Sequence, residues 1–62
     1  MQEEKRKVLS FIAEGLTDEE ISERLGVSRG TTRNRILELF SESGIRTRCG
    51  LITWGFRNGY IK

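Results

Sequence analysis

The sequence predicts a single all-α domain of four helices. Seven glycines and no proline punctuate the chain, and no stretch shows the apolar–polar alternation of a strand. Residues that favour helix N-caps precede three of the predicted helices. With 62 residues and 7.1 kDa, 35% hydrophobic and 32% charged, the chain has room for one small globular domain, residues 1–62.

The helices are expected near residues 3–14, 18–25, 29–43 and 48–58. Each is followed by a glycine that can adopt the left-handed conformation of a helix end. These glycines are Gly15, Gly26, Gly44 and Gly59. The start signals are a T-x-x-E capping box at 17–20 and the N-cap candidates Ser28 and Thr47.

Apolar residues at helical spacing predict which side of each helix is buried. For the helix 29–43 the inward positions are Thr32, Ile36, Leu39 and Phe40. The other core candidates are Val8, Leu9, Ile12, Ile21, Leu25 and Leu51. On the opposite side of the helix 29–43, the outward residues are Arg29, Gly30, Arg33, Asn34, Leu37 and Ser41.

The helix 48–58 has two apolar faces, of which a single-core domain needs one. Leu51, Trp54 and Gly55 form the first face, and Cys49, Ile52 and Phe56 form the second. The second face is either a partner surface or part of the core margin. Gly50 and Gly55, inside the helix, are expected to weaken it because glycine costs roughly 1 kcal/mol against alanine there.

Composition excludes several classes of site. The chain has no His and one Cys, Cys49, which excludes a disulfide framework, a Cys/His zinc site and a catalytic His. We therefore expect a protein that is not an enzyme and has no metal, cofactor or small-molecule ligand. Because no apolar run approaches the roughly 20 residues of a membrane span, and no signal peptide precedes the first helix, we expect a cytoplasmic protein with no membrane partner.

Charge is unevenly distributed along the chain. Residues 1–23 hold seven acidic side chains against three basic ones, whereas residues 24–62 hold eight basic against two acidic. Seven of those eight bases are Arg, which binds phosphate or guanine bidentately. Charge alone leaves open whether this basic part binds a polyanion or is an ordinary solvated surface.

The segment 17–40 has the spacing of a helix-turn-helix. A short helix ends at Leu25, the three-residue turn Gly26-Val27-Ser28 follows, and Ser28 opens a longer helix that can lie in a DNA major groove. Arg33 and Asn34 lie together on its outward side, which holds no acidic residue before Glu38. Arg pairs with guanine and Asn with adenine, so this face favours a polyanionic partner and base contacts.

These residues resemble the DNA-binding domain of LuxR-type (GerE-type) bacterial transcription regulators. The resemblance extends over residues 20–36, over Gly44-Ile45-Arg46-Thr47-Arg48, and over the ending at 54–61. The helix-turn-helix alone is equally similar to region 4 of sigma factors. The G-x-R-x-R element and the fourth helix favour the LuxR type.

The resemblance implies that the helix 29–43 is the recognition helix and that double-stranded DNA is the partner. Base contacts are implied for Arg33, Asn34 and Leu37. The residues expected to bind phosphate, including Arg29 from the outward face, are Thr17, Ser28, Arg29, Thr31, Arg35, Arg46 and Arg48. Family members form two-fold dimers through their last helix, which implies a homodimer interface at Cys49, Ile52 and Phe56.

Two functions from different classes are considered. The first is sequence-specific DNA binding and transcription regulation, by a stand-alone regulator or by the C-terminal domain of a longer one. The second is a protein-interaction module that pairs with a full-length regulator through the helix 48–58 and blocks its activity. The exposed position expected for Leu37, together with the two glycines in the helix 48–58, motivates the second.

Overall fold

The computed structural model describes residues 2–62 and contains four helices. They are α1 (Glu3–Ala13), α2 (Asp18–Leu25), α3 (Arg29–Ser43) and α4 (Arg48–Arg57). Within residues 2–62 there is no strand, in agreement with the predicted all-α class. The four predicted helices are confirmed, and the first and the last end one residue earlier than expected.

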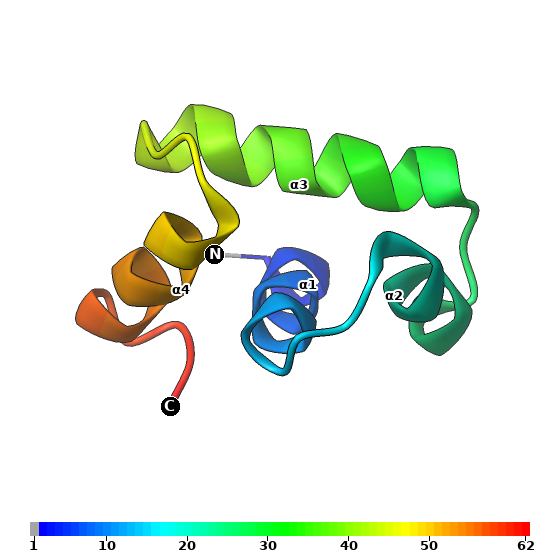
Figure 1. Ribbon diagram of the computed structural model, residues 1–62, viewed down its shortest axis with the longest axis horizontal. Coiled ribbons are helices and arrows are strands. Elements are labelled where there is room, and N and C mark those ends of the chain that lie inside the picture. The colour runs from blue at the N-terminus through cyan, green and yellow to red at the C-terminus, as the bar shows by residue number, and fades with distance from the viewer. Residues whose placement is uncertain (1) are drawn as a thin grey trace.

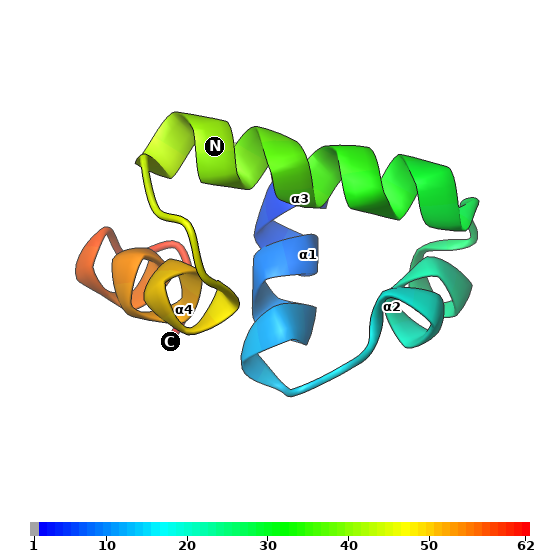
Figure 2. The same cartoon turned by 45° about the horizontal axis from the view of Figure 1, so that its top comes forward.

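The longest helix, α3, lies across one side of the molecule, and the other three helices lie beneath it (Figure 1). Helix α1 is central in this layer, with α2 on one side and α4 on the other (Figure 2). It contacts all three of the other helices. One side of α3 is therefore used by the core, and its other side is left to solvent.

The predicted helix boundaries are confirmed by local hydrogen bonds. Ser28 and Thr47 each accept the backbone N–H three residues ahead, at 3.2 and 3.0 Å. Gly26 ends α2 with φ at 69°, a conformation that side chains with a Cβ rarely adopt. These short-range signals mark where α3 and α4 begin and where α2 ends.

The core lies between α1 and the other helices. Its fully or nearly fully buried hydrophobic side chains are Val8, Leu9, Ile12, Ile21, Ile36, Leu39, Leu51 and Ile61. Two expected core residues, Leu25 and Phe40, are only half-buried and pack against this cluster. Ile61 was not predicted, because it follows the last helix and belongs to no helical pattern.

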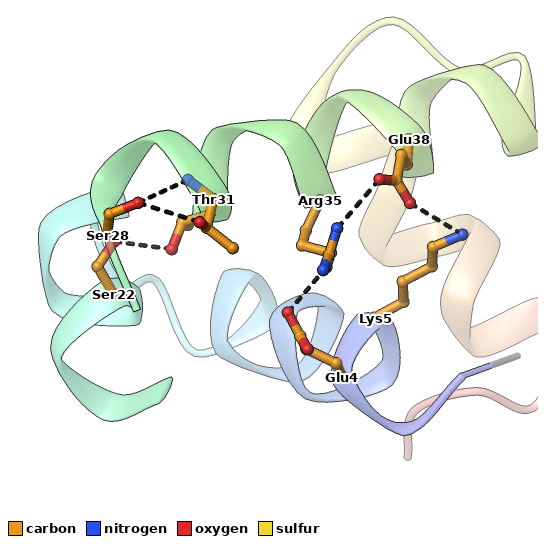
Figure 3. A network of polar contacts seen from close by, with 8 residues as sticks. Glu4, Lys5, Ser22, Ser28, Thr31, Arg35 and Glu38 are labelled. Carbon is orange, nitrogen blue, oxygen red and sulfur yellow. Dashed lines mark hydrogen bonds and ion pairs between the residues drawn. The ribbon is translucent and has the colours of Figure 1, made fainter. Parts of the chain in front are cut away.

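Two polar side chains, Ser22 and Thr32, are also buried, and they bond to each other. Their hydroxyl oxygens lie 2.7 Å apart, and Ser22 donates to the backbone carbonyl of Asp18 at 2.8 Å. Because a buried hydroxyl is costly without a partner, this pair fixes how α2 lies against α3. Figure 3 shows Ser22 pointing toward the start of α3.

The glycines of α4 have a packing role that the sequence analysis missed. A Cβ on Gly55 would lie 2.8 Å from Leu9 Cδ2 and 3.1 Å from Ile61 Cγ1, and a Cβ on Gly50 would lie 2.5 Å from Ile45 Cγ2. The closest approach at each glycine is shorter than real Cβ contacts. The helix-propensity cost of these glycines stays a prediction, and the structure adds that they allow α4 to approach its neighbours closely.

We predict that Thr32→Val lowers the free energy of unfolding by about 1 kcal/mol, the usual net worth of one hydrogen bond. The change keeps the shape of the side chain, and Ser22 keeps its bond to Asp18. Urea unfolding measures the loss. Thr53→Val, on the exposed side of α4, is the control and is expected to cost less. Equal stability of Thr32→Val and the wild type would contradict the role of this bond.

We also predict that Gly55→Ala destabilises the domain although alanine favours helix. Overpacking against Leu9 and Ile61 costs about 1–3 kcal/mol, and all but the lowest value in this range outweighs the roughly 1 kcal/mol gain in helix propensity. The matched control is Gly30→Ala in α3, whose Cβ would have its nearest neighbour at 3.8 Å and is expected to stabilise. Thermal unfolding compares the two, and a more stable Gly55→Ala would refute the packing role.

Candidate nucleic-acid interface

Helices α2 and α3 are joined by the three-residue turn Gly26-Val27-Ser28. The turn places the start of α3 directly after the end of α2, and the bond between Ser22 and Thr32 holds the two helices together. This is the arrangement of a helix-turn-helix, in which the second helix presents its outer side to a partner.

The outer side of α3 is exposed, as the sequence predicts. Arg29, Arg33 and Asn34 are all exposed, and Leu37 one turn further along is 53% exposed. Glu38, the first acidic residue of α3, does not join this face, since its carboxylate is bonded to Lys5 and Arg35. The outer side of the first two turns of α3 therefore presents two guanidinium groups and an amide, with no carboxylate of its own.

The hydroxyls at the helix starts are exposed or half-buried, and each is already used by a cap. Thr17 accepts the N–H of Glu20 at 3.2 Å, while the Glu20 carboxylate accepts the N–H of Thr17 at 3.0 Å. The bond from the Thr17 backbone lowers the pKa of Glu20. At α3 the hydroxyl of Ser28 bonds both the N–H and the hydroxyl of Thr31. At the start of α3, which has no acidic residue in its first turn, an anion would meet a positive helix end and the remaining free N–H groups, whereas the first turn of α2 holds three carboxylates.

The side chain of Arg35, an expected phosphate contact, lies against α1 and not on the outer side of α3. Its Nε donates to Glu4 at 2.8 Å and its Nη1 donates to Glu38 at 3.2 Å, so it joins α3 to the start of α1 (Figure 3). The bond that Arg35 donates to Glu4 and the charge of Glu4, followed by the charge of Glu38, raise the pKa of this guanidinium. Lys5 extends the network to Glu38 and Glu42, and the bond with Glu42 raises the pKa of Lys5.

The two arginines around the start of α4 differ from each other. Arg46 is exposed in the loop before α4, and it forms no ion pair with any of residues 2–62. Arg48, the first residue of α4, donates a hydrogen bond to the carboxylate of Asp18 at the start of α2. Arg46 is thus open to an anion, whereas Arg48 is already paired.

Asp18 is the residue that the sequence analysis missed. It lines a shallow depression of about 330 Å³ with Arg33, Leu37 and Arg48, and a smaller one of about 220 Å³ with Arg29 and Arg33. From the sequence Asp18 was only part of a capping box. Its position beside Arg48 had no local signal because the two are 30 positions apart.

The second apolar face of α4 is partly open. Phe56 is 51% exposed and Cys49 is exposed, while Ile52 is half-buried and packs against the core. The three expected dimer residues therefore differ in exposure, and only Cys49 and Phe56 are exposed. Phe56 and Leu37 are the two large hydrophobic side chains that the described residues expose most, and they lie on different helices.

Other kinds of site have no support among residues 2–62. No group of three or more His, Cys, Asp or Glu side chains is placed to hold a metal ion. None of the helices in this part of the chain is both long enough and apolar enough to cross a membrane.

The comparisons with known proteins agree with the helix-turn-helix arrangement. The chain matches the family model of the homeodomain-like domain over residues 2–47. No curated protein and no solved structure matches it. The match ends at Thr47, so α4, one of the two features that favour the LuxR type over other helix-turn-helix proteins, lies outside it. Because the match covers well over half of the chain, the protein belongs to the homeodomain-like family of helix-turn-helix DNA-binding domains.

Proposed function

We propose that this protein binds double-stranded DNA in a sequence-specific manner, with α3 in the major groove, and that it thereby regulates transcription. The observation that carries the proposal is the outer side of α3, where Arg33 and Asn34 are exposed side by side. An Arg at this position matches the N7 and O6 acceptors of guanine, and an Asn matches N6 and N7 of adenine. Leu37, also exposed, suits an apolar contact with a base.

Phosphate contacts would come from the groups that surround α3. In this proposal Arg29 and Arg46 supply charge, and the helix starts at Thr17, Ser28 and Thr31 supply N–H and hydroxyl groups. Arg35 is left out because its guanidinium is bonded to two carboxylates on the inner side of α3.

The finer assignment to the LuxR type belongs to the same proposal. It rests on the segment Gly44-Ile45-Arg46-Thr47-Arg48 and on the presence of α4 after it. In this form the chain is one DNA-binding domain over residues 1–62, and α4 contributes to self-association. No separate observation favours the alternative, a module that blocks a full-length regulator.

DNA binding is tested by fluorescence anisotropy of a mixed-sequence duplex between about 50 and 300 mM salt. Binding that weakens linearly on a logarithmic salt scale is expected, because each neutralised phosphate releases counterions. Absence of binding at the lowest salt would refute the proposal.

The base-contact and phosphate-contact roles are separated by two variants, measured on a site selected from random DNA. Arg33→Ala is expected to lose about 1–3 kcal/mol of discrimination between the selected site and a mismatched one. Arg46→Ala is expected to weaken binding to both sites alike and to reduce the salt slope by about 1. Unchanged discrimination in Arg33→Ala would remove this residue from the base contacts.

We further propose that two copies associate through the exposed face of α4 around Phe56. Sedimentation equilibrium of the wild type is then expected to show a dimer that Phe56→Asp dissociates. Leu37→Asp is the matched control, since Leu37 is equally exposed but lies on α3, and it is expected to leave the dimer intact. A wild type that stays monomeric at high concentration, or a Phe56→Asp variant that still dimerises, would contradict this interface.

A further inference from the structure

Asp18 is an acidic residue placed among the basic groups of the candidate interface. It is the first residue of α2, and around it lie Arg29 and Arg33 of α3 and Arg48 of α4. Helices α2 and α4 lie on either side of α1, beneath α3, and the contact between Asp18 and Arg48 connects their starts (Figure 2). A carboxylate in this place repels any phosphate that the neighbouring guanidinium groups attract.

The ion pair also uses donors that a phosphate would need. Arg48 directs its Nη2 at Oδ1 of Asp18, and both side chains remain partly accessible, at 43% and 39%. A guanidinium binds carboxylate and phosphate through the same N–H groups, so one ligand excludes the other at those donors. Arg48 is therefore directed toward the protein's own carboxylate.

We propose that Asp18 withholds Arg48 from the DNA backbone, so that the interface makes one phosphate contact fewer than its arginines would permit. Asp18 acts here as a positioning residue, through Arg48, and sets the affinity of the protein for DNA of any sequence. This inference rests on the proposed function, because it requires that DNA binds next to α2 and α4. The residues assigned as contacts raise the affinity for DNA, whereas Asp18 lowers it.

The size of the effect follows from counterion release. One additional phosphate contact steepens the dependence of log K on log salt by about 0.9, which corresponds to about eight-fold tighter binding at 0.1 M salt. An exposed ion pair contributes little to folding, so the loss of the pair itself is not expected to unfold the domain. Asparagine at position 18 also keeps the backbone carbonyl that Ser22 bonds.

The experiment measures binding of a mixed-sequence duplex by anisotropy across the salt range for the wild type, Asp18→Asn, Arg48→Ala and the double variant. Asp18→Asn is expected to bind about eight-fold more tightly at 0.1 M salt, with a slope steeper by about 0.9. Arg48→Ala is expected to change the slope little in the wild type and to abolish the gain when it is combined with Asp18→Asn. Asp18→Glu is expected to keep the wild-type slope, because its carboxylate can still hold Arg48.

The control for a general change of charge is Glu19→Gln, which removes one negative charge from the adjacent exposed position. It is expected to leave the slope unchanged. Circular dichroism checks that each variant is folded.

Three outcomes would overturn the proposal. In the first, Asp18→Asn has the affinity and slope of the wild type. In the second, Arg48→Ala makes the dependence on salt less steep by the same amount with and without Asp18→Asn. This would place Arg48 on a phosphate despite Asp18. In the third, Glu19→Gln steepens the slope as much as Asp18→Asn. If the wild type binds DNA in any of these three outcomes, the proposed function still holds. If neither the wild type nor any variant binds DNA at low salt, both the proposed function and the role of Asp18 are refuted.

Discussion

The hydrogen bond between Ser22 and Thr32 determines how α2 lies on α3, and the exposed surface of α3 depends on that arrangement. Both hydroxyls are buried, and Ser22 also has a partner within α2, so it is the Thr32 hydroxyl that would lose its bond if it stayed buried and α2 moved away. With Thr32 held inward, the residues next to it, Arg33 and Asn34, are turned outward. This polar contact, together with the buried side chains of Ile36 and Leu39, thus specifies which side chains of α3 face a partner.

The charged side chains of α3 are divided between its inner and outer sides. On the inner side, Arg35 and Glu38 bond to Glu4 and Lys5 of α1, which neutralises charge where helices meet. On the outer side, Arg29 and Arg33 have no carboxylate from α3 beside them. The outer side of α3 therefore keeps two positive charges that no residue of α3 offsets, and Asp18 of α2 is the acid that lies beside them.

Sequence analysis predicts this fold well where the signals are local. The capping box at Thr17, the cap at Ser28 and the glycine ending α2 each act within a few residues, and each is confirmed. It fails where the cause is contact between distant segments. Neither the pair of Asp18 with Arg48 nor the use of Arg35 by Glu4 has a local pattern, since these residues are 30 and 31 positions apart. The packing role of Gly55 was missed for the same reason, because it depends on Leu9 of α1 and on Ile61 beyond the end of α4.

The central claim, that the outer side of α3 contacts DNA, is tested most directly by titrating the isotope-labelled chain with duplex DNA and following backbone amide NMR shifts. The largest changes are predicted at Arg29, Arg33 and Asn34. Another depression, lined by Arg6, Lys7 and residues 59–62 among others, contains no residue of α3. The amide shifts of the residues that line it are predicted to change little. The largest changes at that depression, with α3 unaffected, would contradict the account.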